Sequence, residues 1–195
     1  RILFNNKNLL THSPHNIVKI GITRTFQNLQ IMPYMTVLDN VLLGAHSRIN
    51  SSSVIKRFIS REQREKEEGL ALEVLDFLGI VNYEGKYIAG LPYGIQKLIE
   101  IARALIAKPK LILLDEPAAG MNEQETREIA KIITEIRENL SVTVLVVEHD
   151  MNLVMSISDR ICVLDSGKVI TTGIPAVVKS HPQVIKAFLG GPAHA

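Results

Sequence analysis

A run of four aliphatic residues followed by two acids constrains the fold of this chain more than any other feature. Residues 111–114 read Leu-Ile-Leu-Leu, too continuous for a strand with one face in water, and predict a strand buried on both faces of a parallel sheet. Asp115 and Glu116 follow, and Pro117 ends the strand because it lacks a backbone donor. Strand side chains alternate in direction, so the two acids are expected to have different roles.

The position of these acids predicts a functional site. In open α/β sheets, ligands bind at the carboxyl ends of the strands, and buried carboxylates are costly unless they are paired or bind a cation. The alternative is an ordinary strand end with two solvated acids, and the motif alone favours function only modestly.

The second half of the chain alternates strands and helices. The segment after Asn122 has Ile129, Ile132, Ile133 and Ile136 on one face of a predicted helix. Further strands are expected at 142–147, where the strand is again buried, and at 160–165 and 168–172, with short helices at 174–180 and 182–189. This alternation predicts right-handed βαβ units and a mostly parallel sheet.

The first half is richer in helices. Strands are expected at residues 1–5 and 22–26, and a short helix closed by Gly21 lies between them. A loop over 27–35 leads to a helix over 36–45 that opens with a Thr36-x-x-Asp39 capping box. Residues 51–53 suggest a linker, and two more helices are expected at 61–78 and 94–107.

Composition excludes several classes of protein. The net charge of +2 on 195 residues gives no basic footprint for nucleic acid or for an anionic membrane surface. The single cysteine, Cys162, excludes an internal disulfide and is expected in the core. No apolar stretch approaches the roughly 18 residues of a membrane span, so a soluble cytoplasmic chain is expected. The histidines apart from His149 show no metal-ligand spacing.

Four short motifs, in this order, carry a family resemblance. They are Arg-Thr-Phe-Gln-Asn at 24–28, Leu-Pro-Tyr-Gly-Ile-Gln-Lys at 91–97, Asp-Glu at 115–116 and Glu-His-Asp at 148–150. Together they resemble the ATP-binding subunit of an ABC transporter, over nearly the whole chain. The subgroup it looks most like is the ATPases of branched-chain amino-acid importers, which Pro-Ala-Ala-Gly at 117–120 and Glu-Ile-Ala-Arg-Ala-Leu at 100–105 also resemble.

The resemblance implies a fold and a setting. The fold is α/β, a P-loop NTPase (RecA-like) parallel sheet with an inserted α-helical subdomain. Residues 1–195 would form one nucleotide-binding domain: a helical subdomain at about 36–107, catalytic core strands at 108–172 and a C-terminal helical tail at 173–195. Implied partners are a second ATP-binding subunit, membrane permease subunits and, indirectly, a periplasmic-type substrate-binding protein, with no nucleic acid. The implied location is the cytoplasmic face of the inner membrane.

The resemblance also implies site residues for ATP and Mg²⁺. Glu116 would be the base that polarises the attacking water, His149 would contact the γ-phosphate, and Gln27 would contact Mg²⁺ or water and sense the permease. Asp115, with Gln27, would hold Mg²⁺ largely through water. The remaining nucleotide-binding positions are Tyr93, Gly94, Ile95, Gln96, Gly120 and Asn122.

The sequence departs from the family pattern at the motif 91–97 and at the P-loop, and Glu123 replaces a proline that is common after Asn122. Pro92 stands where a serine is usual and Ile95 where Gln or Glu is usual, so the serine contact to phosphate is absent. No Gly-x-x-x-x-Gly-Lys-Ser/Thr motif occurs, and its amides and lysine would cradle the phosphates. The chain begins with Arg1 in a strand-like run, and in the family the P-loop precedes that strand. We therefore expect a missing upstream segment and an inactive chain in its absence.

Other functions remain open. An ABC-type ATPase acting on nucleic acid or ribosomes would show a coiled-coil insertion, a tandem second ATPase half or a basic face, and none is visible. A non-catalytic or truncated interaction module would require that the gene begins at residue 1. An importer ATPase for urea, amides or another substrate would share most of the motifs.

Overall fold

The computed structural model describes residues 1–26, 29–47 and 61–188. Its centre is a parallel sheet of three strands in the order β3-β4-β5, formed by Ile22–Arg24, Leu111–Asp115 and Thr143–Val147. Ile22 pairs with Leu111, and Leu111 in turn pairs with Thr143, so the carboxyl ends of the strands lie at one edge. The predicted α/β class and parallel core are confirmed.

The two long strands of the sheet are buried on one face only. Ile112 and Leu114 of β4 are 0% and 1% exposed, whereas Leu111 and Leu113, on the opposite face, are partly exposed. Along β5, Leu145 and Val147 are about half exposed, so the prediction of strands buried on both faces is wrong for 111–114 as well as for 142–147. Within the described residues β5 pairs only with β4, so β5 is an edge strand of this sheet.

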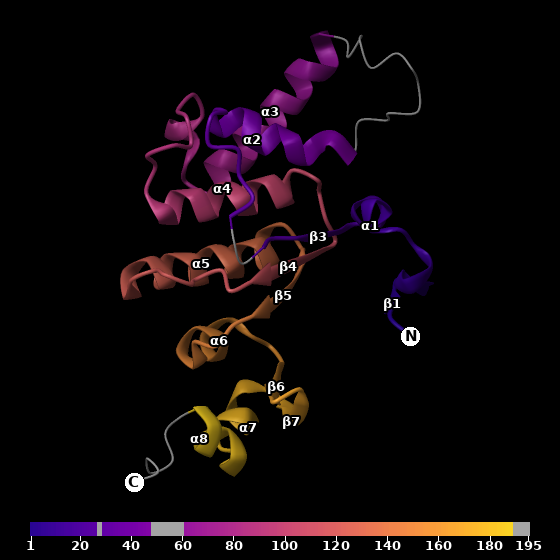
Figure 1. Ribbon diagram of the computed structural model, residues 1–195, viewed down its shortest axis with the longest axis vertical. Helices are drawn as coiled ribbons and strands as arrows, with labels where there is room; N and C mark the ends of the chain where they lie inside the picture. The colour runs from indigo at the N-terminus through magenta and orange to yellow at the C-terminus, as the bar shows by residue number, and fades with distance from the viewer. Residues whose placement is uncertain (27–28, 48–60, 189–195) are drawn as a thin grey trace.

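A layer of three helices covers one side of the sheet (Figure 1). It contains α2 (Val37–Leu43), α3 (Arg61–Phe77) and α4 (Tyr93–Leu105), which share the main hydrophobic core with β4 and α5 (Glu123–Asn139). The helix expected through Ala45 ends at Leu43 and continues as a 3₁₀ turn, Gly44–Ser47. Within the ranges that the structure describes, no helix is both long and apolar enough to cross a membrane.

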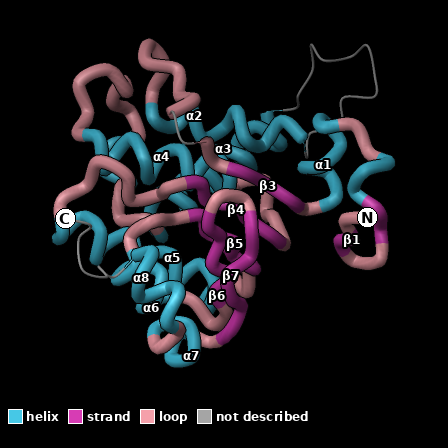
Figure 2. Tube along the Cα trace, turned by 60° about the horizontal axis from the view of Figure 1, so that its bottom comes forward, coloured by secondary structure: helices cyan, strands magenta, loops and turns pink. Residues whose placement is uncertain are grey.

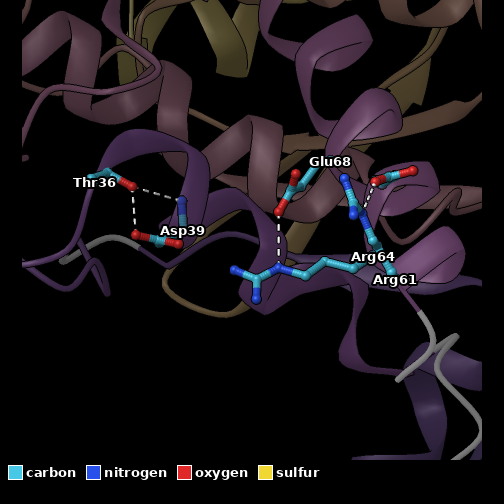
Figure 3. Close-up of polar contacts among 6 residues, drawn as sticks. Thr36, Asp39, Arg61, Arg64 and Glu68 are labelled. Carbon is cyan, nitrogen blue, oxygen red and sulfur yellow. Dashed lines mark hydrogen bonds and ion pairs between the residues drawn. The ribbon is translucent and has the colours of Figure 1, made fainter. Parts of the chain in front are cut away.

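Local side-chain contacts fix the starts of these helices. Thr36 caps α2 by accepting a hydrogen bond from the backbone N–H of Asp39, and its hydroxyl donates to the Asp39 carboxylate at 2.6 Å, as Figure 3 shows. At the exposed start of α3, Arg61 and Arg64 pair with glutamates one turn later, at 2.8 and 3.0 Å. Each exposed pair adds only about 0.3–0.5 kcal/mol.

The amino-terminal region is short and lies at the edge of the molecule. The strand expected at residues 1–5 is reduced to β1 (Leu3–Phe4), which pairs antiparallel with β2 (Lys7–Asn8). After a 3₁₀ turn, Leu9–Thr11, helix α1 (Pro14–Ile20) ends at Gly21, whose φ of 99° and two backbone hydrogen bonds close the helix as the sequence predicts.

The C-terminal strands form a separate unit with its own small core (Figure 2). Strands β6 (Ile161–Asp165) and β7 (Lys168–Gly173) make the predicted hairpin and form a sheet of their own. Helices α6 (Met151–Ile157), α7 (Pro175–Lys179) and α8 (Pro182–Phe188) accompany it. Cys162 is exposed, contrary to prediction, because Ile161 and Val163 occupy the buried face and strand side chains alternate.

Candidate functional site

Glu116 and His149 come together at the carboxyl ends of two neighbouring strands. The amide of Glu116 continues the ladder by donating to Val147 O at 2.9 Å, and His149 Nδ1 lies 3.7 Å from Glu116 Oε1. Glu116 has a left-handed backbone with φ of 45°. Such a conformation costs a non-glycine residue about 1–3 kcal/mol and is common at functional sites.

Asp115 lies beside Glu116 but has a different partner. Its Oδ2 accepts a hydrogen bond from Arg24 Nη2 at 2.7 Å, and its amide donates to Thr25 Oγ1 at 3.3 Å. The ion pair is partly exposed, with 26% of the Asp115 side chain accessible, so it contributes about 0–1 kcal/mol. Arg24 was expected as part of a strand and of the motif at 24–28, without a role of its own, and its contact with an acid 91 positions away leaves no local signal in the sequence.

The carboxylate of Glu148 is hydrogen-bonded to the backbone at this strand end. Its side chain is only 2% exposed and accepts hydrogen bonds from the amides of Ala118 and His149, at 3.0 and 3.1 Å. The buried carboxylate therefore fixes the turn that follows Glu116 to the end of β5. Glu148 belongs to the motif at 148–150, but nothing in the sequence around it indicated this role. Asp150 caps α6 by accepting from the amides of Asn152 and Leu153.

The motif at residues 91–97 forms the start of α4. Pro92 is the N-cap and makes no side-chain capping hydrogen bond. Gln96 instead reaches back, donating from Nε2 to Leu91 O at 2.8 Å, and Ile95 packs against the main core. Tyr93 is 43% exposed. The first backbone amides of this helix carry the partial positive charge of a helix N-terminus, which favours anions.

The turn between β4 and α5 touches this helix start. Gly120 has φ of 77°, and a Cβ added to it would lie 3.6 Å from Tyr93 Cε1. A Cβ added to Gly94 would lie 3.3 Å from Glu125 Oε1. Asn122 caps α5 through a complete capping box with Glu125, so its side-chain oxygen already accepts two amide hydrogen bonds. The structure thus brings Tyr93 and Gly94 together with Gly120 and the start of α5.

Gln27 lies outside the described residues, but contacts are present on both sides of it. The amide of Phe26 donates to Glu100 Oε1 at 3.1 Å, and Arg103 Nη1 donates to Gln30 O. Burial lowers the pKa of Arg103, and the nearby Glu100 carboxylate opposes that shift. Glu100 and Arg103 both belong to α4, so this helix contacts the loop at two points.

Further along the same loop, Met32 and Tyr34 are 49% and 86% exposed. Their backbone is well anchored: buried Asn40 accepts from Met32 N at 2.8 Å and donates to Met32 O at 3.0 Å. Hydrogen bonds from the amides of Ile88 and Ala89 to Met35 O and Pro33 O tie the loop to the segment before α4. Two large apolar side chains are thereby presented to solvent on a fixed backbone.

Comparison with known proteins identifies the family. The profile described as "ABC transporter" matches residues 1–119, and the profile described as "Branched-chain amino acid ATP-binding cassette transporter" matches residues 168–194. The chain belongs to the ABC transporter family. Members of this family bind nucleotide and couple ATP hydrolysis to transport. The predicted resemblance is therefore confirmed.

Two curated relatives of this ABC domain are similar over most of its length. The high-affinity branched-chain amino acid transport ATP-binding protein LivG of Escherichia coli is 35% identical over 192 residues, which cover 97% of this chain and 75% of LivG. BraF of Pseudomonas aeruginosa, described in the same words, is 38% identical over 180 residues, covering 90% of this chain and 70% of BraF.

Solved ABC structures share the architecture. A crystal structure of the ADP conformation of an ATP-binding cassette from an ABC transporter matches with a TM-score of 0.79 and 31% identity, over 96% of this chain and 76% of that one. A dimeric ATP-binding cassette in a post-hydrolysis state, bound to ADP and phosphate, matches with a TM-score of 0.69 and 25% identity, over 88% and 72%.

Proposed function

We propose that this ABC domain hydrolyses ATP to drive the import of branched-chain amino acids. The observation that carries the proposal is the meeting of Asp115, Glu116 and His149 at the ends of two parallel strands, in a chain similar to LivG over 97% of its length. Phosphoryl transfer requires mainly positioning and charge stabilisation. The two acids and the histidine at this strand end would position Mg²⁺ and the attacking water, and Mg²⁺ would stabilise the phosphate charge.

The two acids divide the work. Glu116, which lies on the ladder to β5, accepts a proton from the attacking water, and His149 beside it orients toward the γ-phosphate. Asp115 would hold Mg²⁺ largely through water, and Gln27 would contact Mg²⁺ or one of its waters. When bound, Mg²⁺ would neutralise part of the negative charge on the phosphates.

The oxygen ligands at this edge fit Mg²⁺ better than a cation whose ligands must all come from protein side chains. Within the described ranges, no group of three or more His, Cys, Asp or Glu side chains could hold a metal. Mg²⁺ commonly keeps several waters and binds one or two carboxylates together with substrate phosphates. A single partly exposed carboxylate such as Asp115 suits that mode, once Arg24 releases its oxygen.

The start of α4 serves the nucleotide held by a second subunit. The amides near Tyr93, Gly94, Ile95 and Gln96 form the anion-binding end, and Gly120 and Asn122 in the neighbouring turn contact the same partner. A related cassette is dimeric when bound to ADP and phosphate, which supports a dimer here.

The remaining partners and the division of the chain follow from the same proposal. Residues 36–107 form the helical subdomain, 108–172 the catalytic core strands and 173–195 the C-terminal tail. Permease subunits hold the domain at the cytoplasmic face of the inner membrane. A periplasmic-type binding protein delivers the substrate to the permease, and no nucleic acid is bound.

A binding and turnover measurement tests the catalytic proposal. Residues 1–195 alone contain no P-loop, so we expect no micromolar ATP affinity and no hydrolysis. A P-loop chimera, in which the P-loop segment of an ABC ATPase is joined before Arg1, should bind and hydrolyse ATP. Isothermal titration and phosphate release measure the two activities. Micromolar affinity in residues 1–195, or an inert folded chimera, would contradict the proposal.

We expect the segment 27–45 to dock on the permease through the exposed side chains of Met32 and Tyr34. Ile31, which was expected to be exposed with them, instead packs against the main core. Replacing either side chain with glutamate places a charge in an apolar contact, which should lower transport about tenfold or more while ATP hydrolysis by the isolated P-loop chimera is unchanged. Substrate uptake into proteoliposomes measures the first quantity. Met32→Leu and Tyr34→Phe are the matched controls, and normal uptake in the glutamate variants would remove this surface from the interface.

A mixed-dimer experiment tests whether each ATP is shared between two subunits. Gly94→Asp adds a side chain and a negative charge at the anion-binding end of α4, so the homodimer should lose ATP-dependent association. Mixing it with a chimera whose P-loop lysine is replaced leaves one site with both defects and one with neither. Nucleotide binding should return at one site per mixed dimer. If each subunit used its own α4, mixing would restore nothing.

A further inference from the structure

A mainly apolar cavity lies at the end of the sheet opposite to Asp115 and Glu116. Its volume is about 420 Å³, within the range of roughly 300–1,000 Å³ that small-molecule sites occupy. Pro109 and Val142 in its wall come just before β4 and β5, and other parts of the wall come from α3 and the end of α4. The cavity therefore lies between the helical layer and the amino ends of the strands, away from the proposed ATP site.

Apolar side chains make most of the wall. Of the ten described residues that line the cavity, eight are apolar, including Phe77 from α3, Ile106 after α4 and Leu140 after α5. Ile106 is 1% exposed, whereas Leu140 is 44% exposed, so the apolar surface continues from the interior to the mouth of the cavity. Such a surface favours a hydrocarbon group, because contact removes both from water.

The two charged residues that line the cavity are opposite in sign. Glu73 lies on α3, and Lys108 follows α4. Among the contacts of the described residues, neither side chain has a hydrogen bond or an ion pair, with the other or with a third group. A carboxylate and an ammonium group at one apolar cavity are complementary to a ligand that carries both charges and a hydrocarbon group.

The backbone fixes the position of Lys108 at the cavity. Its φ is 52°, a left-handed conformation that glycine or asparagine usually adopts after a helix. Its amide donates to Leu105 O at 2.8 Å, and the next residue, Pro109, is buried and leads into β4. A lysine has no conformational advantage at this turn, so its side chain is the feature that needs an explanation.

We propose that this cavity is a binding site for a free amino acid with a branched apolar side chain. Glu73 receives the ammonium group, Lys108 receives the carboxylate, and the hydrocarbon group lies against Phe77 and Ile106. The site requires neither ATP nor a partner subunit, because none of its lining residues belongs to the proposed ATP site. A bound amino acid contacts the helices and the starts of β4 and β5 at once, and so holds the helical layer to the sheet.

Isothermal titration of residues 1–195 tests the class of ligand. We expect L-leucine to bind with a dissociation constant of about 1 mM or below. Leucinamide, which lacks the carboxylate charge, and isocaproate, which lacks the ammonium group, should each bind about tenfold more weakly or worse. Alanine should bind more weakly by a similar factor, because it lacks the branched chain. No binding of leucine at about 10 mM, or equal affinity for leucine and isocaproate, would overturn the proposal.

Substitutions test the role of each charged residue. Glu73→Gln and Lys108→Met should each weaken leucine binding about tenfold, whereas the matched controls Glu62→Gln, in the same helix, and Lys110→Met should not, since neither residue lines the cavity. Lys108→Met should also bind leucine and leucinamide equally, because the group that distinguishes them is gone. A Lys108→Met protein with a changed melting temperature and unchanged leucine affinity would show that Lys108 serves only the end of α4, and the proposal would be wrong.

Amide hydrogen exchange locates the bound amino acid. Saturating leucine should slow exchange about tenfold at the amides of Ile106 and Val142, which donate to Ala102 O and Ile136 O beside the cavity. Exchange at Val184, in the separate C-terminal core, should not change. Protection at Val184 without protection at Ile106 and Val142 would place leucine elsewhere and overturn the proposal.

Discussion

Replacing Glu116 with glutamine should slow ATP turnover by a factor of about 10²–10⁴ and leave nucleotide binding nearly intact. The amide has the size and shape of the carboxylate but cannot accept a proton from water, so the loss belongs to the transition state. The side chain lies 3.7 Å from His149 Nδ1 on a backbone of unusual geometry, and glutamine leaves that backbone unchanged. Phosphate release and ATP titration of the P-loop chimera give the two quantities.

A companion substitution separates the neighbouring acid from Glu116. Asp115→Asn should weaken Mg²⁺-dependent nucleotide binding, because a neutral amide attracts the waters of Mg²⁺ less than a carboxylate does. It should also release Arg24, which is paired with Asp115 at 2.7 Å. If Glu116→Gln retained turnover within a few-fold of the parent, Glu116 would not be the base. Equal loss of nucleotide binding in both variants would show that the two acids act together.

Replacing Gly44 with alanine should destabilise the folded chain by about 3 kcal/mol or more. An added Cβ would lie 2.0 Å from Arg103 O and 2.8 Å from Ile106 Cγ2, closer than any real Cβ contact. The carbonyl belongs to the backbone of α4, so relief requires α2 and α4 to separate, and overpacking of this kind is costly. For a domain of this size the melting temperature should fall by about 6 °C or more.

Gly69 provides the matched control for this measurement. It lies inside α3, where an added Cβ meets nothing within 4 Å. Gly69→Ala should therefore stabilise the chain by about 0.5–1 kcal/mol, the ordinary helix preference of alanine over glycine. Thermal unfolding followed by circular dichroism compares the two. A Gly44→Ala protein as stable as the parent would mean that α2 and α4 do not approach each other this closely.

Gly44→Ala and Glu116→Gln should affect different parts of the structure. Gly44 permits α2 to approach α4, and α4 in turn contacts the segment that leads to Asp115. The Gly44→Ala variant, which is expected to be less stable, should therefore also show faster amide hydrogen exchange at Phe26. Glu116→Gln should leave that exchange rate unchanged.

Much of the local structure could be predicted because its causes lie within a few residues. The aliphatic run before Asp115 formed β4, Thr36 and Asn122 capped the helices expected of them, and Gly21 closed α1 with a positive φ. The family was also readable from short motifs in the correct order, since each motif is a contiguous segment. The roles assigned to individual site residues, Gln27 among them, stay predictions.

Tertiary structure decided the features that depend on distant neighbours. Periodicity indicated apolar strands, but only the packing showed that Val147 and Cys162 face outward. The helix predicted through Ala45 ended earlier, at the point where Gly44 meets the backbone of α4. Arg24 meets Asp115 across 91 positions, and Phe26 meets Glu100 across 74. The sequence by itself determined what each segment prefers; the contacts of Arg24 and Glu100 arose only when packing placed those segments side by side.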